Sequence, residues 1–412
     1  MTKRILIAGG GPNQLEFIRK AREMGVFAAV VDGDPSAPGL AEADRGEIGD
    51  IRNAEVLEAL ARALRVDGVL PGAELAVEAV ASACAALGLP GIPPETARGV
   101  RDKAAMREAL QEAGFHTPRF RIARNAGEAA KAACELGFPL VMKPSDGNAS
   151  KGVQTVSRVE EVSLAFDHAA QASSGGVALL EEYLEGEEYC VDGLAHEGEF
   201  HLGGVTGKER SALPYRYDLG IFMPPLLSPR QEQAIEETVR AALRAIGFGE
   251  GLVHAEVILD EAASLERSGA GPPSGCHIVE IAGRPGGGRI PTDLIPLVYG
   301  SDFPADCIRV ILGEAPVSKR RHCRGAALYW LPGASGIVER VEGCGEARRM
   351  PGVRDVVIGV KPGDELGPAV DCVARDRIGY VLTEGATADE AIQRARAARD
   401  HCHVVTRPAH LQ

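Results

Sequence analysis

Two glutamates lie inside apolar stretches of the sequence, where an unpaired charge would be costly to bury. Glu256 stands in "VHAEVILD" and Glu280 in "HIVEIAGRPGGGRIP". If these stretches form neighbouring strands, the two carboxylates can hold Mg²⁺ together, because Mg²⁺ prefers one or two carboxylates plus substrate phosphates. A structural ion pair with Arg284 is the alternative, and the residues by themselves leave both interpretations open.

A lysine and a small polar loop follow another apolar strand, in "PLVMKPSDGNASKGV". The strand ends in Lys143, and the loop contains Gly147, Asn148, Ser150, Lys151 and Gly152. Backbone N–H groups of such a loop can surround phosphate oxygens, while the lysine supplies a point charge. The alternative is an ordinary hairpin turn beside a lysine whose stem packs on apolar surface.

Two further stretches could bind a ligand. In "LLEEYLEGEEYCVD", three leucines are mixed with five glutamates. This pattern fits a hinge strand that offers backbone groups and a carboxylate to a base and a ribose, but by itself it favours an edge strand with a solvated acidic face. Arg284 and Arg289 flank "PGGG", whose backbone leaves room for a ligand. An arginine there can bind a carboxylate or phosphate through two hydrogen bonds, although a turn with a surface arginine fits equally well.

The N-terminal part of the chain should provide a parallel sheet. Apolar strands alternate with amphipathic helices in the order "ILIAG", 14–24, "FAAVVDGD", 53–65, "VDGVLPG", 74–87 and "LGLPGI". Such alternation predicts a doubly wound domain with right-handed crossovers.

After the N-terminal part, the pattern of predicted secondary structure changes. Pro94 and Pro118 bracket two helical stretches, of which the second ends at Gly114 as a C-cap glycine would. Period-two strands, a hairpin turn at "HEGEF" and helices at about 158–171 and 228–246 predict an antiparallel α+β region. Residues 261–276 are rich in Gly, Pro and Ser and predict an exposed, mobile hairpin connection. From about 320 onward, short strands and a helix at 387–400 indicate a small mixed domain.

Composition narrows the class of protein. A chain of 412 residues has room for two to four domains. Its nine cysteines are scattered without a CxxC pair, which favours reduced thiols over a metal or disulfide framework. We find no signal-peptide pattern and no apolar run near the ~20 residues of a membrane span, so we expect a cytoplasmic protein. The formal net charge of −13 disfavours nucleic acid and favours a small-molecule substrate.

The chemical signals follow one another in a specific order. It runs through Lys103, Lys143, the glycine-rich loop, "EEYLEGEE", Glu256, Glu280 and "EIAGRPGGG". In this order the chain resembles the ATP-grasp superfamily over nearly its whole length, close to the biotin carboxylase and carbamoyl-phosphate synthetase branch. The resemblance implies a Rossmann-like pre-ATP-grasp domain at 1–95, linker helices and a lobe with the phosphate loop at 96–175, a second lobe with adenine, magnesium and substrate residues at 176–318, and an α/β domain at 319–412.

The resemblance also assigns roles to single residues. Those expected at the nucleotide are Lys103, Lys143, Ser150, Gly152, Glu181, Glu182, Tyr183, Leu184 and Glu188. Both lysines would hold ATP phosphates under the closing loop 145–152, Glu181 would face the adenine amino group, and Glu188 would accept the ribose hydroxyls. Glu256 and Glu280 would hold Mg²⁺, which Mn²⁺ could replace. The sequence departs from the pattern at Ala282, where many relatives have asparagine, and this puts a second Mg²⁺ in doubt.

Within the superfamily, the chain looks most like the dipeptide-forming L-amino-acid ligases. The run "GGGPNQLEFIRKAREMG", the segment "EIAGRPGGGRIPTDLIPLVYGSDF" and the length carry this resemblance. It implies an ATP-dependent ligase that joins a carboxylate, such as that of an amino acid, to an amine through an acyl phosphate and releases ADP and phosphate. Relatives are often homodimers, so we expect a homodimer here as well. Arg284 would bind the carboxylate and, with Lys143, take part in catalysis. Further substrate contacts expected are Gly287, Gly288, Arg289, His254, Lys208 and Arg210.

Three alternatives remain open at this point. One is a bicarbonate- or formate-using carboxylase-type enzyme of purine or biotin metabolism, and another is an ATP sensor without catalysis. The third is a nicotinamide oxidoreductase built on Gly9, Gly10 and Gly11, but a dinucleotide fingerprint wants a glycine where this chain has Gln14. We therefore expect the glycine turn to face the substrate, and Asp32 and Asp34 need not touch a ribose.

Overall fold

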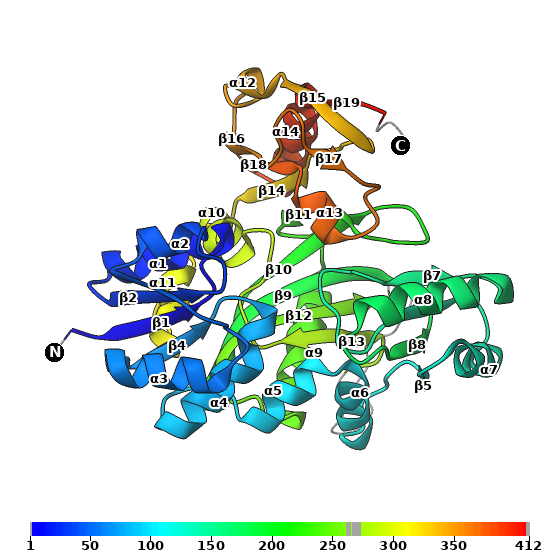
Figure 1. Ribbon diagram of the computed structural model, residues 1–412, viewed down its shortest axis with the longest axis horizontal. Coiled ribbons are helices and arrows are strands. Elements are labelled where there is room, and N and C mark those ends of the chain that lie inside the picture. The colour runs from blue at the N-terminus through cyan, green and yellow to red at the C-terminus, as the bar shows by residue number, and fades with distance from the viewer. Residues whose placement is uncertain (1, 261–264, 266–272, 409–412) are drawn as a thin grey trace. The chain divides into compact units, whose positions relative to one another are not determined.

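The computed structural model describes residues 2–260, 265 and 273–408, and the chain divides into two compact units. The first unit comprises residues 1–117, 186–205 and 227–322, and the second comprises 118–185, 206–226 and 323–412. Figure 1 follows the chain through them by colour. Most of the expected hairpin connection at 261–276 lies outside the described residues. The division into four domains stays a prediction.

A parallel four-stranded sheet forms the N-terminal part of the first unit, in the order β3-β2-β1-β4. Its strands are β1 (Arg4–Ala8), β2 (Phe27–Asp32), β3 (Arg45–Ile48) and β4 (Gly68–Pro71). The helices between and after them are η1 (Pro12–Gln14), α1 (Leu15–Glu23), α2 (Pro38–Glu42), α3 (Ala54–Leu64), η2 (Glu74–Ala76) and α4 (Val77–Leu87). Apolar residues of the strands pack against α3 and α4, as the alternating pattern predicts. The doubly wound domain is confirmed.

The prediction of a strand at "LGLPGI" is wrong. Helix α4 ends at Leu87, Gly88 takes the left-handed conformation with φ 65°, and no strand follows before α5 (Pro94–Arg101). Proline lacks the N–H group that a sheet ladder needs, so the closely spaced Pro90, Pro93 and Pro94 oppose a strand here. The fourth strand is instead β3, which the sequence pattern did not reveal because its short stretch "RGEI" is not apolar.

The remainder of the first unit contains three antiparallel strands with one apolar and one polar face. They are β9 (Glu187–His196), β12 (Gly251–Leu259) and β13 (Cys276–Ala282), and β9 continues through the "HEGEF" turn into β10 (Glu199–Arg210). The helices are α5, α6 (Lys103–Glu112), α9 (Pro229–Ala245), η4 (Ile290–Leu294), α10 (Ile295–Tyr299) and α11 (Phe303–Ile311). Odd-numbered residues such as Val191 and Ala255 belong to the core formed with α9. Side chains alternate along a strand, so even-numbered residues such as Asp192 and Glu256 lie on the other face.

The second unit contains an antiparallel four-stranded sheet in the order β5-β8-β6-β7. Its elements are β5 (Phe120–Ala123), α7 (Ala126–Leu136), β6 (Leu140–Pro144), β7 (Gln154–Val156), η3 (Val159–Glu161), α8 (Val162–Ala172) and β8 (Ala178–Glu182). Residues of α7 and α8 form one apolar core with the strands. Since β6 and β7 are antiparallel neighbours, the glycine-rich loop between them is a hairpin connection.

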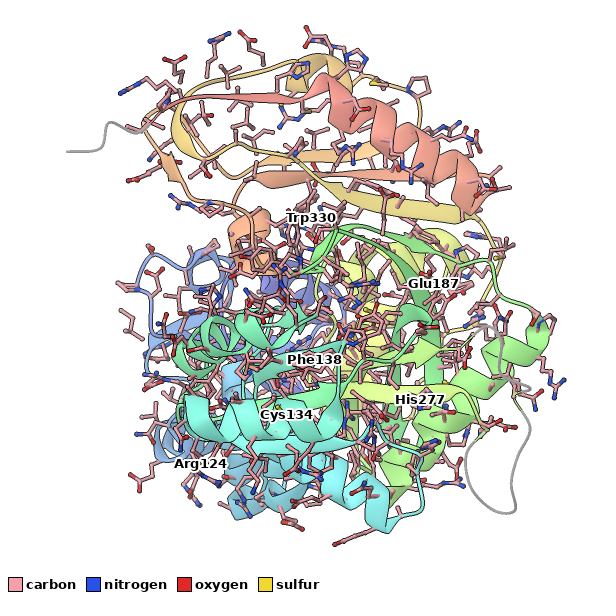
Figure 2. All side chains as sticks on the ribbon, turned by 90° about the vertical axis from the view of Figure 1, so that its right-hand side faces the viewer. Arg124, Cys134, Phe138, Glu187, His277 and Trp330 are labelled. Atoms are coloured by element: carbon pink, nitrogen blue, oxygen red, sulfur yellow. The ribbon has the colours of Figure 1, made fainter. Side chains whose placement is uncertain are left out.

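The C-terminal part of the second unit is mixed, as expected. It contains β11 (Asp218–Met223), β14 (Gly325–Trp330), β15 (Gly336–Glu342), α12 (Cys344–Ala347), β16 (Val353–Ile358), β17 (Glu365–Leu366), α13 (Cys372–Asp376), β18 (Gly379–Gly385), α14 (Ala388–His401) and β19 (His403–Arg407). Neighbouring strands run in the orders β11-β14-β18-β16 and β17-β15-β19. At the end of β14 the guanidinium of Arg375 covers the ring of Trp330, labelled in Figure 2, at 3.4 Å.

All nine cysteines are free of disulfide bonds. Among the helices that the structure describes, none combines the length and the apolar character needed to cross a lipid bilayer.

Gly68 provides a test of the packing in the first unit. A Cβ atom at this position of β4 would overlap the carbonyl oxygen of Ile311. We expect Gly68→Ala to lower the free energy of unfolding by about 1–3 kcal/mol, the usual cost of overpacking. The control is Gly99→Ala in α5, where the added Cβ meets no atom within 4 Å. Alanine should stabilise that helix by about 0.5–1 kcal/mol. Urea unfolding monitored by circular dichroism measures both, and equal midpoints would contradict the expectation.

Candidate active site

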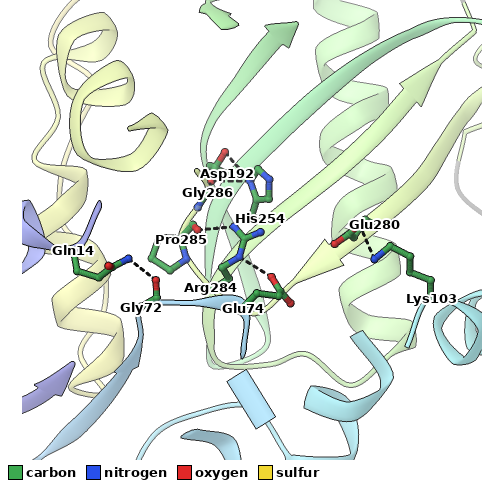
Figure 3. A network of polar contacts seen from close by, with 10 residues as sticks. All are labelled: Gln14, Gly72, Glu74, Lys103, Asp192, His254, Glu280, Arg284, Pro285 and Gly286. Carbon is green, nitrogen blue, oxygen red and sulfur yellow. Dashed lines mark hydrogen bonds and ion pairs between the residues drawn. The ribbon is translucent and has the colours of Figure 1, made fainter. Parts of the chain in front are cut away.

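A pair of carboxylates lies on the polar face of the first unit's antiparallel strands. Glu256 of β12 and Glu280 of β13 are directly opposite each other in the strand register. Like charges in this position repel, so the arrangement needs a cation. Lys103, the first residue of α6, places its Nζ atom 3.1 Å from Oε2 of Glu280 and is only 5% exposed (Figure 3). The structure thus brings Lys103 together with both glutamates, and oxygen ligands of this kind suit Mg²⁺.

Arg284 lies in the loop directly after β13 and is held by Glu74 of η2. Its Nε donates to Oε2 of Glu74 at 2.6 Å, and its Nη1 donates to the carbonyl oxygen of Pro285 at 2.8 Å (Figure 3). Burial alone would lower the pKa of Arg284. The carboxylates of Glu74, Glu280 and Asp192 reverse that effect, so the pKa of this guanidinium is raised. The ion pair of Arg284 is therefore with Glu74, which was not expected at the site, and the arginine stays a cation at any physiological pH.

Asp192 of β9 connects His254 of β12 with the "PGGG" loop. Its Oδ1 lies 3.1 Å from Nδ1 of His254 and accepts a hydrogen bond of 3.0 Å from the backbone N–H of Gly286 (Figure 3). Asp192 is 1% exposed. Asp192 was not expected at the site either. The alternation of side chains along β9 could have indicated it, because this alternation places Asp192 on the polar face of the strand, opposite His254. The buried carboxylate fixes both the imidazole and the start of the loop.

Three more residues expected to contact the substrate, Gly287, Gly288 and Arg289, lie in or directly after the "PGGG" loop. Gly287 has open space where a Cβ would stand, and Gly288 takes the left-handed conformation with φ 60°. Arg289 forms two hydrogen bonds with Asp293, from Nε to Oδ2 at 2.8 Å and from Nη2 to Oδ1 at 2.7 Å. The guanidinium of Arg289 thus stabilises the first turn of η4.

Polar side chains next to the N-terminal glycine turn form hydrogen bonds that stabilise it. Asp32 accepts hydrogen bonds from the backbone N–H groups of Gly10 at 2.7 Å and Asp34 at 2.8 Å, one to each oxygen. Gln14 donates from Nε2 to the carbonyl oxygen of Gly72 at 2.6 Å (Figure 3). These contacts tie the turn to the ends of β2 and β4.

In the second unit, Lys143 and Glu181 form a buried ion pair. Nζ of Lys143 on β6 lies 2.6 Å from Oε2 of Glu181 on the neighbouring β8, and both side chains are nearly inaccessible to water. Glu182, the next residue, accepts hydrogen bonds from the backbone N–H and from Nε of Arg119 at 2.9 and 2.8 Å. The two adjacent glutamates therefore have different surroundings, and only Glu181 is next to the lysine.

Three residues of the loop 145–152 have a positive φ, a backbone conformation that glycine adopts without strain. Ala149, Ser150 and Gly152 have φ values of 53°, 56° and 73°. The carbonyl oxygen of Ala149 accepts a hydrogen bond of 3.1 Å from the N–H of Cys372, the first residue of α13. This contact within the second unit holds the middle of the loop.

The remaining expected residues lie near β10 and β8. Tyr183 Oη accepts a hydrogen bond of 3.1 Å from Nη1 of Arg216, and Arg210 donates from Nε to the carbonyl oxygen of Arg216 at 2.8 Å. Lys208 lies on β10 opposite Ile221 of β11. Leu184 follows the end of β8, and Glu188 belongs to the first unit, on the polar face of β9.

Comparison with known proteins gives two matching family models. The ATP-grasp domain matches residues 136–288, and the L-amino acid ligase C-terminal domain 2 matches residues 328–407. Among solved structures, the L-amino acid ligase from Bacillus licheniformis superposes with a TM-score of 0.82 at 22% identity, covering 98% of this chain and 99% of that one. Phosphoribosylglycinamide synthetase from Anaerococcus prevotii has a TM-score of 0.74 at 20% identity and covers 99% of this chain and 100% of that one.

Curated sequences are similar as well. Formate-dependent phosphoribosylglycinamide formyltransferase of Erythrobacter litoralis is 26% identical over 98% of both chains. Carnosine synthase 1 of Gallus gallus is 32% identical over 77% of this chain and 36% of its own length. Both domain models and the fold agree with the resemblance seen in the motifs. The chain contains an ATP-grasp domain and an L-amino acid ligase C-terminal domain, and it is an enzyme of the ATP-grasp ligase type.

Proposed function

We propose that the protein joins the carboxylate of one amino acid to the amine of another through an acyl phosphate, releasing ADP and phosphate. The observation that carries this proposal is the cationic Arg284 in the loop that follows the Glu280 strand, in a chain whose C-terminal domain matches that of L-amino acid ligases. An arginine can bind a carboxylate through two hydrogen bonds and then stay in contact with the acyl phosphate formed from it.

The first unit would supply the charge compensation that this reaction requires. A carboxylate that attacks a phosphoryl group brings two anions together, so positioning and electrostatic stabilisation dominate the catalysis. Magnesium, when bound, neutralises phosphate oxygens, and Glu256 and Glu280 would be its protein ligands. Lys103 would turn from Glu280 towards a phosphate, since its Nζ already lies at the carboxylate pair. Ala282 offers no ligand, so water or substrate would complete a second magnesium site.

The second unit would supply most contacts to the nucleotide. Lys143 and the backbone of loop 145–152, with Ser150 and Gly152, would hold phosphates, and Glu181 would face the adenine amino group. Glu182 is already engaged with Arg119, so we assign its side chain no contact with the nucleotide. Tyr183 and Leu184 would line the ring edge, and Glu188 of the first unit would accept the ribose hydroxyls.

A second candidate is an enzyme that activates bicarbonate or formate. It is favoured by the relative from Erythrobacter litoralis, whose match spans almost the whole of both chains. The match of residues 328–407 to an L-amino acid ligase domain favours the first candidate. In either case we propose small molecules, ATP and Mg²⁺ or Mn²⁺ as the partners, with a homodimer in the cytoplasm as the working form.

The deciding experiment is a matrix of substrates. ADP formation is measured for every pair of amino acids in the presence of ATP and Mg²⁺, and condensed products are identified by mass spectrometry. We expect ADP release that depends on an amino acid pair and matches a dipeptide or amide product. ADP release that depends on bicarbonate or formate and ignores amino acids would contradict the proposal.

Glu280→Gln tests the metal role of the carboxylate pair. The amide keeps the size of the side chain but removes the negative charge that would hold Mg²⁺, so we expect ADP formation to fall to background at an unchanged unfolding midpoint. Glu232→Gln, on the exposed side of α9, is the matched control and should keep the wild-type rate. Full activity of the Glu280 variant would remove this residue from the metal site.

Gly286→Ala tests the position of the loop that carries Arg284. A Cβ atom there would overlap the carboxylate of Asp192 and press on Nδ1 of His254. We expect a loss of ADP formation of about tenfold or more, because the loop must move to relieve the overlap, and a displacement of about 1 Å in a group that positions the substrate can cost about 100-fold in rate. The control is Gly99→Ala in α5, where the added Cβ meets no atom within 4 Å, and this variant should keep the wild-type rate. Equal rates of the two variants would show that the Asp192 contact does not position the loop.

A further inference from the structure

Three side chains of metal-binding type converge on the polar face of the first unit's strands. They are Cys190 of β9 and His254 and Glu256 of β12, and one ligand atom of each lies within 4.8 Å of the other two. In the register of the two strands Cys190 is directly opposite Glu256. His254 and Glu256 are two residues apart on one strand and therefore project from the same face.

The imidazole of His254 is oriented by a carboxylate. Its Nδ1 lies 3.1 and 3.2 Å from the two oxygens of Asp192, which is opposite it in the register (Figure 3). Histidines that bind metals commonly direct one ring nitrogen at a carboxylate, which fixes the tautomer and leaves the other nitrogen for the ion. Asp192 is itself held by the N–H of Gly286 at 3.0 Å, so Nε2 of His254 is the donor that remains.

The donor set differs from the one that magnesium prefers. Mg²⁺ takes oxygen ligands, whereas Zn²⁺ is bound by sulfur, nitrogen and oxygen together, with bonds of about 2.0–2.3 Å in a tetrahedral arrangement. Three protein ligands and an open fourth position are compatible with such a site. Cys190 and His254 are 4% and 8% exposed, so the surroundings limit competition from water.

We propose that Cys190, His254 and Glu256 bind Zn²⁺ or the chemically similar Cd²⁺, and that the bound ion inhibits the ligase. On binding, the Cys190 thiol releases its proton to solvent, a sulfur–metal bond forms, and the ion gives up one water for each protein ligand. Inhibition follows because Glu256 is drawn away from the magnesium that it would hold. This second half rests on the proposed function, whereas the binding itself does not.

The binding test uses CdCl₂ with the purified, metal-free full-length protein. A thiolate bound to Cd²⁺ has a charge-transfer absorption in the ultraviolet, and we expect one such band to saturate at one ion per chain. Cys190→Ser and Cys190→Ala should each remove it, so that failure of one variant to fold leaves the other. Cys134→Ser is the control, since this cysteine of α7 is exposed and belongs to the second unit. An unchanged band in both Cys190 variants, or no band in the wild type, would overturn the site.

Asp192→Asn separates the orienting role from the ligands. The amide keeps the shape of the side chain but loses the charge that holds the imidazole, and changes of this kind typically cost about 10- to 100-fold in metal affinity. We expect the cadmium titration to shift to higher concentration with the band still present. An unshifted titration would contradict an orienting role for Asp192.

The inhibition test compares ADP formation at saturating Mg²⁺ with and without ZnCl₂, without added thiols. Each variant is compared with its own rate in Mg²⁺ alone. We expect Zn²⁺ to inhibit the wild type, a chelator to restore the rate, and the Cys190 variants to lose at least tenfold in sensitivity. Equal sensitivity of wild type and variants would overturn the inhibitory role. If no substrate pair supports ADP formation, the proposed function fails, while the cadmium band still decides the metal site.

Discussion

Negative charge on a largely buried sheet face is the constraint on which the rest of the first unit depends. Glu256 and Glu280 are opposite each other, and Asp192 lies on the next strand of the same face. Carboxylates in such surroundings need cations and hydrogen bonds, because removing one partner of a buried ion pair typically costs about 3–5 kcal/mol. Lys103 and Arg284 provide the cations, and they come from different elements, α6 and the loop after β13. The arrangement of these elements and the charge balance of the face therefore depend on each other.

In the second unit, a buried negative charge is balanced by a single lysine. Lys143 on β6 and Glu181 on the neighbouring β8 form an ion pair, and both side chains are buried. A nucleotide phosphate that approached Lys143 would compete with Glu181 for the ammonium, so the neighbouring loop 145–152, with its backbone N–H groups, would have to supply additional donors. Ala149 and Ser150 take the left-handed conformation, which costs a residue with a Cβ about 1–2 kcal/mol, so the contacts around the loop must hold it in this shape.

Much of the fold could be predicted from periodicity, whereas the partners in the site could not. The alternation of strands and helices predicted the doubly wound sheet, because local patterns determine which faces are buried. The apolar stretches around Glu256 and Glu280 predicted two strands, and the structure pairs them. The strand expected at "LGLPGI" was wrong because its prolines outweigh its apolar residues. Glu74 is 210 residues from Arg284 in the sequence, and Asp192 is 62 residues from His254. Contacts of that range depend on the register of the assembled sheet. For the same reason, the position of Cys190 opposite Glu256 could not be predicted from the sequence, where Cys190 belongs to no CxxC pair.

The position of Trp330 determines what optical measurements on this protein report. It is the only tryptophan in the chain, it is buried at the end of β14, and Arg375 lies over its ring. Its emission therefore depends on the packing of the second unit, whereas far-ultraviolet circular dichroism responds to the helices of both. Unfolding curves from the two methods would coincide only if the units lose their structure together. A single side chain thus makes the cooperativity between the two units directly measurable.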